Sequence, residues 1–125
     1  MDTLGNKGSV GISLRLNETR ICFVCSHFAS DTDKLQKRNA DFRSSKQRLK
    51  FEYNANMDYF DLDGHDVVFW FGDLNYRLDK ISLNNTIDKI YSNEMNELIE
   101  FDQLTKEMRR LNVFDEYSEG IKMYF

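Results

Sequence analysis

The stretch Trp70-Phe71-Gly72-Asp73-Leu74-Asn75-Tyr76-Arg77 decides how this chain is interpreted. It continues from Val67-Val68-Phe69, and such a run of β-branched and aromatic residues is typical of a buried strand. The glycine is expected to turn the backbone where that strand ends. Open α/β sheets place their ligand groups just beyond the carboxyl ends of strands. The sequence therefore predicts a functional loop that begins here.

Asp73 and Asn75 give this loop its chemistry. They lie two residues apart, so in extended geometry their side chains point to the same side. A carboxylate can take a proton from water, and a neighbouring amide can orient that water or a phosphate oxygen. The pair therefore indicates hydrolysis. The alternative is that the two residues only form a polar turn, as Gly-Asp-x-Asn often does after a strand.

Length and composition indicate a soluble protein with one domain. The chain has 125 residues, of which 41% are hydrophobic and 30% are charged. No apolar stretch approaches the roughly 20 residues that are needed to cross a bilayer. No signal peptide opens the chain, so a cytoplasmic location is expected.

Charge is distributed unevenly along the chain. Residues 1–50 carry ten basic and five acidic side chains, whereas residues 51–125 carry seven basic and sixteen acidic ones. The net charge of −4 argues against nucleic acid as a partner. The basic half could attract an anionic head group, which allows peripheral contact with a membrane surface. Alternatively, the basic residues from Lys34 to Lys50 are simply the solvated face of a helix.

Cys22 and Cys25 form a C-x-x-C pattern within an expected strand. Residues three apart on a strand face opposite sides of the sheet. The two thiols therefore cannot converge on a metal or form an unstrained disulfide. We expect buried free thiols and no metal ligand among the residues of this chain.

Alternation and turn residues predict the structure before the signature stretch. Apolar and polar residues alternate from Val10 to Leu16, Asn17-Glu18-Thr19 is typical of a turn, and a second strand is expected at 21–25. Together they predict an antiparallel hairpin. A helix is expected from an N-cap within Asp31 to Asp33 as far as about Leu49. A loop with little regular structure is expected at 52–66.

The signature strand is expected at 67–71 and is interpreted as a central strand. Val67, Phe69 and Phe71 would share one face, with Val68 and Trp70 on the other. Both faces are expected to be covered, because continuous apolar runs are typical of strands buried on both sides. Three short helices are expected later, at 84–91, 94–101 and 103–111. Strands that alternate with helices favour the α/β class.

Six landmarks resemble the inositol polyphosphate 5-phosphatases, the family that includes the synaptojanins. Their order and approximate spacing agree with the family over essentially the whole chain. They are Gly5-Asn6-Lys7-Gly8-Ser9-Val10-Gly11, Ser26-His27-Phe28-Ala29, Arg38-Asn39-Ala40-Asp41-Phe42, Trp70-Phe71-Gly72-Asp73-Leu74-Asn75-Tyr76-Arg77, Asp102-Gln103-Leu104 and Ser118-Glu119-Gly120.

The resemblance implies a fold and a reaction. The fold is part of the four-layer α/β sandwich shared with DNase I-like phosphodiesterases. The reaction is magnesium-dependent removal of the 5-phosphate from inositol polyphosphates or phosphoinositides, a step in lipid signalling. Asp73 would be the base that deprotonates water, Asn75 would hold that water or the phosphate, and His27 would contact the scissile phosphate. On its own, a histidine after an apolar strand is more often a structural hydrogen-bonding residue.

The resemblance also implies residues that bind the substrate. Asn6 and Lys7 would lie near the metal and the head group, although Gly-Asn-Lys-Gly is also an ordinary hairpin turn. Tyr76 and Arg77 either touch phosphate or brace the loop. Arg38 and Asn39 are interpreted as helix-face residues that support the site.

Two family elements have no counterpart in these 125 residues. One is a metal-binding glutamate upstream of Gly5, and the other is a C-terminal Ser-Asp-His segment, with which His65 cannot be aligned. Asp31 also stands where many relatives carry a second histidine. Residues 1–125 are therefore interpreted as a partial catalytic domain that has little activity alone. The alternatives are a module that binds phosphoinositide or protein without turnover, and a nuclease or phosphodiesterase of the same superfamily.

Overall fold

The structure is a computed structural model that describes residues 5–52 and 58–119. The chain divides into two compact units, Met1–Asn75 and Tyr76–Phe125, and each is described by itself. The first unit combines a sheet with a helix and the second is mainly helical, so the α/β character expected from the sequence is present. None of the helices in the described part of the chain combines the length and apolarity needed to span a membrane.

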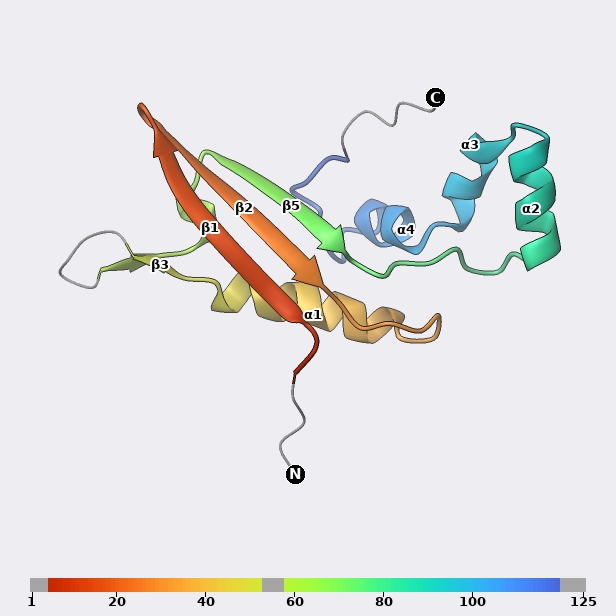
Figure 1. The fold of residues 1–125 in the computed structure, drawn as a ribbon, viewed down its shortest axis with the longest axis horizontal. Coiled ribbons are helices and arrows are strands. Elements are labelled where there is room, and N and C mark those ends of the chain that lie inside the picture. Colours follow the sequence, from red (N-terminus) through yellow and green to blue (C-terminus); the bar gives the residue numbers. More distant parts are fainter. Residues whose placement is uncertain (1–4, 53–57, 120–125) are drawn as a thin grey trace. The chain divides into compact units, whose positions relative to one another are not determined.

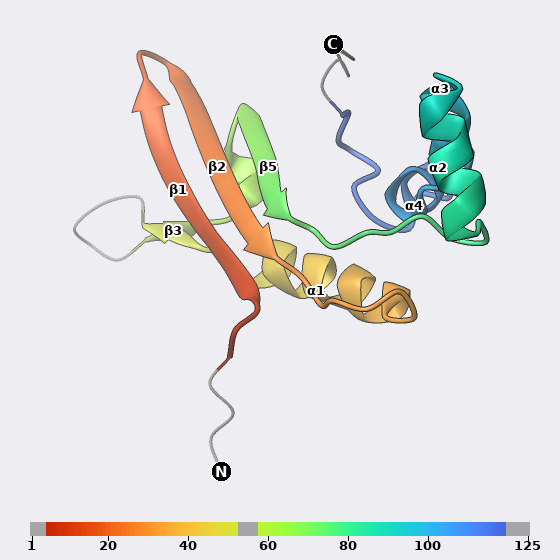
Figure 2. The same ribbon diagram turned by 45° about the vertical axis from the view of Figure 1, so that its right-hand side comes forward.

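The first unit is built on three long strands, β1 (Gly8–Leu16), β2 (Thr19–His27) and β5 (Val67–Asp73), which lie in the order β1-β2-β5. β1 and β2 form the expected antiparallel hairpin, and β5 lies parallel to β2 (Figures 1 and 2). Among the described residues, β2 is therefore the central strand and β5 lies at an edge. The interpretation of β5 as a central strand is wrong.

One face of this sheet is covered by α1 (Leu35–Arg48) and by the segment that follows it. Phe42 of α1 packs against Trp70 of β5, with 4.9 Å between the ring centroids. Cys22 and Val24 of β2 form a core cluster on this side together with two apolar side chains from the crossover segment, Phe51 and Leu62. Trp70 is thus covered by the helix.

The opposite face of the sheet is apolar and exposed. Its exposed members come from all three strands and include Val10, Ile12, Leu14, Leu16, Phe23, Val67, Phe69 and Phe71. We call this set the open face. Phe69 is 50% exposed, although its ring stacks on that of Phe23 at 5.1 Å. The odd-numbered residues of β5 share this face as predicted, but the prediction that it is covered is wrong, because Val67, Phe69 and Phe71 are exposed.

Gly72 lies inside β5, where it pairs with Ser26 of β2, and does not turn the chain after it. Its φ is +123°, and a Cβ at this position would stand 2.2 Å from the Ser26 carbonyl oxygen. Only glycine allows β2 and β5 to approach this closely. The strand therefore continues two residues beyond the predicted end, and Asp73 is its last residue.

The crossover from β2 to β5 differs in detail from the sequence prediction. α1 begins after Lys34 with no side-chain cap, so the N-cap expected within Asp31 to Asp33 is wrong. The predicted loop contains two short pairing strands, β3 (Phe51–Glu52) and β4 (Tyr59–Phe60), and a 3₁₀ turn at Leu62–Gly64. The part of that prediction that falls on residues 53–57 lies outside the described residues.

The two cysteines occupy opposite faces of β2, as the sequence predicts. Cys22 is fully buried and Cys25 is exposed on the open face, and both are free thiols. The expectation that both are buried is wrong for Cys25. Burial raises the pKa of the Cys22 thiol above its ordinary value.

The second unit contains the three helical segments predicted from the sequence. They are α2 (Leu83–Tyr91), α3 (Met95–Leu98) with the 3₁₀ turn Ile99–Phe101, and α4 (Gln103–Arg109). Ser82 caps α2 by accepting a hydrogen bond from the Asn85 amide, and Asp102 caps α4 by accepting one from the Thr105 amide. Polar caps therefore fix the starts of both helices.

Candidate active site

The site lies at the edge of the sheet where β2 and β5 end and β1 begins. Because β2 and β5 are parallel, their last residues, His27 and Asp73, are register partners. Because β1 is antiparallel to β2, its first residue, Gly8, also pairs with His27. Lys7 precedes Gly8 and arrives at the same edge. The topology thus gathers a cation, an imidazole and a carboxylate from positions far apart in the sequence.

The three side chains form a polar cluster. Lys7 Nζ lies 2.6 Å from His27 Nε2, and that same nitrogen lies 3.6 Å from Asp73 Oδ2. A lysine ammonium only donates, so Nε2 is the acceptor in its contact with Lys7. The His27 and Asp73 side chains are 48% and 67% exposed. The cluster is therefore open to solvent and to a charged ligand.

Asn75 braces this edge. Its backbone has a φ of 58°, so the chain turns after Asp73 and the expected extended geometry, with both side chains on one side, is wrong. The Asn75 backbone N–H donates to Asp73 Oδ1 at 3.2 Å, and its side-chain amide donates to the Phe28 carbonyl at 3.0 Å. Asn75 thus holds the Asp73 carboxylate and the segment that follows His27.

Two side chains of α1 complete the support of that segment. Asp41 accepts a hydrogen bond from the Ala29 N–H at 2.9 Å, and Arg38 donates to the Ala29 carbonyl at 3.1 Å. The Phe28 N–H donates to the Asp73 carbonyl at 3.1 Å. Every backbone donor and acceptor of Phe28 and Ala29 is therefore engaged. Arg38 is itself fully buried and also donates to the Asp31 carbonyl at 2.6 Å.

The remaining predicted site residues lie in different surroundings. Asn6 is exposed and precedes β1 by two residues. Tyr76 and Arg77 open the second unit, where the Arg77 N–H donates to Gln103 Oε1 at 3.1 Å and its carbonyl accepts from the Gln103 N–H at 3.0 Å. The cluster described for the first unit consists of Lys7, His27 and Asp73, with Asn75 as its brace.

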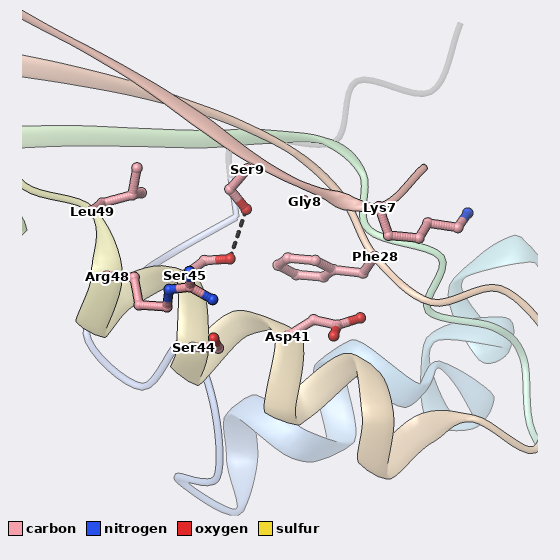
Figure 3. Close-up of a pocket in the computed structure, with 9 residues that line it drawn as sticks. All are labelled: Lys7, Gly8, Ser9, Phe28, Asp41, Ser44, Ser45, Arg48 and Leu49. Carbon is pink, nitrogen blue, oxygen red and sulfur yellow. Dashed lines mark hydrogen bonds between the residues drawn. The ribbon is translucent and has the colours of Figure 1, made fainter. Parts of the chain in front are cut away.

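A cavity of about 470 Å³ lies beside this cluster, between the start of β1 and α1 (Figure 3). Lys7 lines it together with Ser45 and Arg48 of α1, which were not singled out from the sequence. The helical spacing of three residues between Ser45 and Arg48 is the signal that could have placed them on one helix face.

The acidic residues at this edge do not form a complete metal site. Within residues 5–52 and 58–119 there is no group of three or more His, Cys, Asp or Glu side chains that could hold a metal ion. Asp73 can offer one carboxylate ligand. A divalent cation would need further ligands.

Comparisons with known proteins agree on one relationship. A model of the Endonuclease/Exonuclease/phosphatase family 2 matches residues 1–124. The chain is 40% identical over 126 residues to type I inositol polyphosphate 5-phosphatase 1 of Arabidopsis thaliana, which covers 96% of this chain and 21% of that protein. It is 35% identical over 116 residues to synaptojanin of Caenorhabditis elegans, with 93% and 10% covered. The chain thus spans about a fifth or less of these two relatives.

Comparison with solved structures supports the same relationship. The chain is similar to the inositol polyphosphate 5-phosphatase domain of SPsynaptojanin, solved in complex with inositol (1,4)-bisphosphate and a calcium ion. The TM-score is 0.78 at 34% identity, covering 89% of this chain and 31% of that one. The predicted fold class, an α/β part of a DNase I-like sandwich, is confirmed by this match. A Cimex nitrophorin, with a TM-score of 0.63 at 24% identity, shares the fold alone.

Proposed function

This chain belongs to the Endonuclease/Exonuclease/phosphatase family 2, and from that premise we propose that it supplies part of an inositol polyphosphate 5-phosphatase active site. The reaction is hydrolysis of the 5-phosphate ester of inositol polyphosphates or phosphoinositides. The Arabidopsis relative is an inositol polyphosphate 5-phosphatase by name, and the domain of SPsynaptojanin binds an inositol bisphosphate. Both support a phosphorylated inositol as the substrate.

The observation that carries this proposal is the convergence of Lys7, His27 and Asp73 at one edge of the sheet. Asp73 accepts a proton from water as the water oxygen bonds to phosphorus. The ester bond then breaks, and the inositol oxygen takes a proton from solvent. Lys7 and His27 face the phosphoryl oxygens, where charge develops. Asn75 keeps Asp73 oriented and contacts the water or the phosphate.

A divalent cation, which we propose to be Mg²⁺, would neutralise phosphate charge in this reaction. The described residues do not build its site on their own, because they offer no cluster of three or more suitable side chains. We also propose that Asn6 lies near that cation and the head group, and that Tyr76 and Arg77 either touch phosphate or brace the loop. We place the reaction in the cytoplasm, where the phosphoinositide form of the substrate would bring the protein to a membrane surface.

We propose further that the 125-residue chain alone turns over little substrate. Asp73 can generate a nucleophile, but loss of each electrostatic stabiliser costs on the order of 100- to 1,000-fold in rate. The incomplete set of metal ligands also favours the second candidate, a module that binds phosphorylated inositol without turnover. Binding and turnover are therefore measured separately.

The test measures phosphate release from inositol 1,4,5-trisphosphate in millimolar Mg²⁺. It uses the chain alone and a chimera in which residues 1–125 replace the matching segment of the synaptojanin domain. We expect little release from the chain and release from the chimera that falls about 100- to 10,000-fold with Asp73→Asn. Chimera activity that is unchanged by Asp73→Asn would remove Asp73 from the mechanism. A circular-dichroism spectrum of each chimera controls for folding.

Two further outcomes separate the alternatives. A chimera that folds and binds inositol phosphate without release would favour the binding module. Nicking of supercoiled plasmid by the same preparations, sensitive to Asp73→Asn, would favour a nuclease or another phosphodiesterase. Robust release by the chain alone, dependent on Asp73, would show that residues 1–125 suffice for turnover.

A further inference from the structure

The cavity beside Lys7 has walls of mixed chemistry (Figure 3). Lys7 and Arg48 contribute positive charge, and Asp41 contributes one carboxylate. Phe28 and Leu49 add an apolar portion of wall. The remaining side chains are those of Ser9, Ser44 and Ser45, which carry hydroxyl groups.

A chain of hydrogen bonds holds the Ser45 hydroxyl at the wall of the cavity. The Trp70 indole N–H donates to Ser26 Oγ at 2.8 Å. Ser26 Oγ is hydrogen-bonded to Ser9 Oγ at 2.6 Å, and Ser9 Oγ to Ser45 Oγ at 2.7 Å, the bond drawn in Figure 3; in both pairs either hydroxyl can be the donor. Each serine oxygen has two lone pairs and one proton, so the Ser45 hydroxyl keeps hydrogen-bonding capacity for a ligand in the cavity.

Arg48 lies one helical turn beyond Ser45 and adds a stronger donor. Its guanidinium carries five N–H groups that match the oxygens of a phosphate. Among the described residues, no ion-pair partner holds it in another position. The Arg48 guanidinium, with the Ser45 hydroxyl beside it, thus favours an acceptor-rich anion.

Asp41 selects a different part of the same ligand. One of its carboxylate oxygens accepts the Ala29 N–H at 2.9 Å. The other oxygen faces no donor in the described structure and can accept a hydroxyl from a ligand. A bare anion would be repelled by this carboxylate. A molecule with both phosphate and hydroxyl groups can place its phosphate at Arg48 and a hydroxyl at Asp41.

We propose that this cavity is a binding subsite for a phosphorylated polyol. Ser45 and Arg48 bind a phosphate that is not hydrolysed, and Asp41 accepts a ring hydroxyl. Lys7 belongs to both the cavity and the catalytic edge, so one ligand can reach from one to the other. The assignment rests on the proposed function, because it names where that reaction's substrate is recognised away from the scissile phosphate.

The test is isothermal titration of the purified 125-residue chain with inositol 1,4-bisphosphate, which carries no 5-phosphate and so cannot undergo the proposed reaction. Inorganic phosphate and myo-inositol are the comparison ligands. We expect the bisphosphate to bind more tightly than either. Arg48→Gln should weaken its binding at least about tenfold, because a charge-assisted pair is lost. Ser45→Ala should weaken it about threefold to tenfold.

Lys37→Gln is the matched control, since it removes one positive charge from an exposed position of α1 outside the cavity. Equal weakening by Lys37→Gln and Arg48→Gln would reduce the effect to general electrostatics and overturn the subsite. Absence of bisphosphate binding, or equal affinity for inorganic phosphate, would also overturn it. Thermal unfolding of each variant shows that the fold is kept.

The outcome is separable from that of the proposed function. Asp73-dependent turnover in the chimera with no effect of Arg48→Gln on binding would leave the reaction in place and remove the subsite. Binding that depends on Arg48 without any turnover by the chimera would support the subsite and count against the proposed reaction.

Discussion

The side-chain amide of Asn75 donates a hydrogen bond to the backbone carbonyl of Phe28, 3.0 Å away. This bond joins the turn that follows Asp73 to the residue that follows His27. The two functional strands are therefore tied together beyond their last ladder pair. The spacing of His27 and Asp73 depends on this tie as well as on the sheet.

Replacing Asn75 with alanine should destabilise the first unit by about 2–3 kcal/mol. The Phe28 carbonyl would lose its side-chain donor, and alanine would have to adopt a φ of 58°. Asn17→Ala is the control, because Asn17 has a similar φ of 53° in an exposed turn. Urea unfolding should show a loss of about 1 kcal/mol for the control. Equal losses would mean that the tie to Phe28 contributes nothing.

Gly72→Ala should destabilise the sheet by at least about 3 kcal/mol or prevent folding. The added Cβ would meet the Ser26 carbonyl oxygen at 2.2 Å, and a φ of +123° is strained for alanine. Gly8→Ala, with no atom within 4 Å of the added Cβ, should change stability by less than about 1 kcal/mol. Chemical denaturation of both variants provides the comparison. A mild Gly72→Ala effect would contradict the close approach of β2 and β5.

The two thiols should differ sharply in reactivity. Iodoacetamide should modify Cys25 in the folded chain and reach Cys22 only on unfolding, because Cys22 is fully buried. Since burial raises the Cys22 pKa, the folded state holds that proton more tightly than the unfolded state. Stability should therefore fall as the pH rises above the ordinary thiol value of 9.0, and this loss should shrink in Cys22→Ala. Modification of Cys22 before Cys25, detected by mass spectrometry of the labelled chains, would contradict the predicted difference in reactivity.

The open face should make the chain self-associate. Its exposed apolar side chains come from three neighbouring strands, and large exposed apolar patches mark sites of association. Phe69→Lys should shift sedimentation-velocity profiles toward monomer at the same protein concentration. Leu83→Lys, at a position 74% exposed in α2, should leave the profiles unchanged. A wild-type chain that stays monomeric at high concentration would count against this interpretation.

The sequence predicted the structure correctly where residues close together in the chain determine it. Alternation from Val10 to Leu16 predicted β1, because the side-chain period of a strand is two, although the apolar residues of the pattern lie on the open face. Residues 84–91 were predicted as a helix for similarly local reasons, and the structure begins it one residue earlier, with Ser82 as the cap. The family resemblance supplied the fold as a whole, which spacing alone could not.

The errors share a different cause, which is contact between distant segments. Gly72 looked like a turn because its role depends on the nearness of Ser26, forty-six residues earlier in the chain. Asn75 looked extended because its bond to Phe28 is equally non-local. Phe69 looked buried because an apolar strand does not reveal which of its faces another element covers.

The parallel pairing of β2 with β5 has a kinetic consequence. The β1–β2 hairpin closes across a two-residue turn, whereas His27 meets Asp73 only after the whole crossover has been ordered. Loop-closure entropy makes such distant contacts late and slow to form during folding. Lys7 and His27 can therefore meet early, within the hairpin, while the carboxylate joins them last. Within the first unit, we therefore expect the catalytic edge to assemble only after the hairpin has formed.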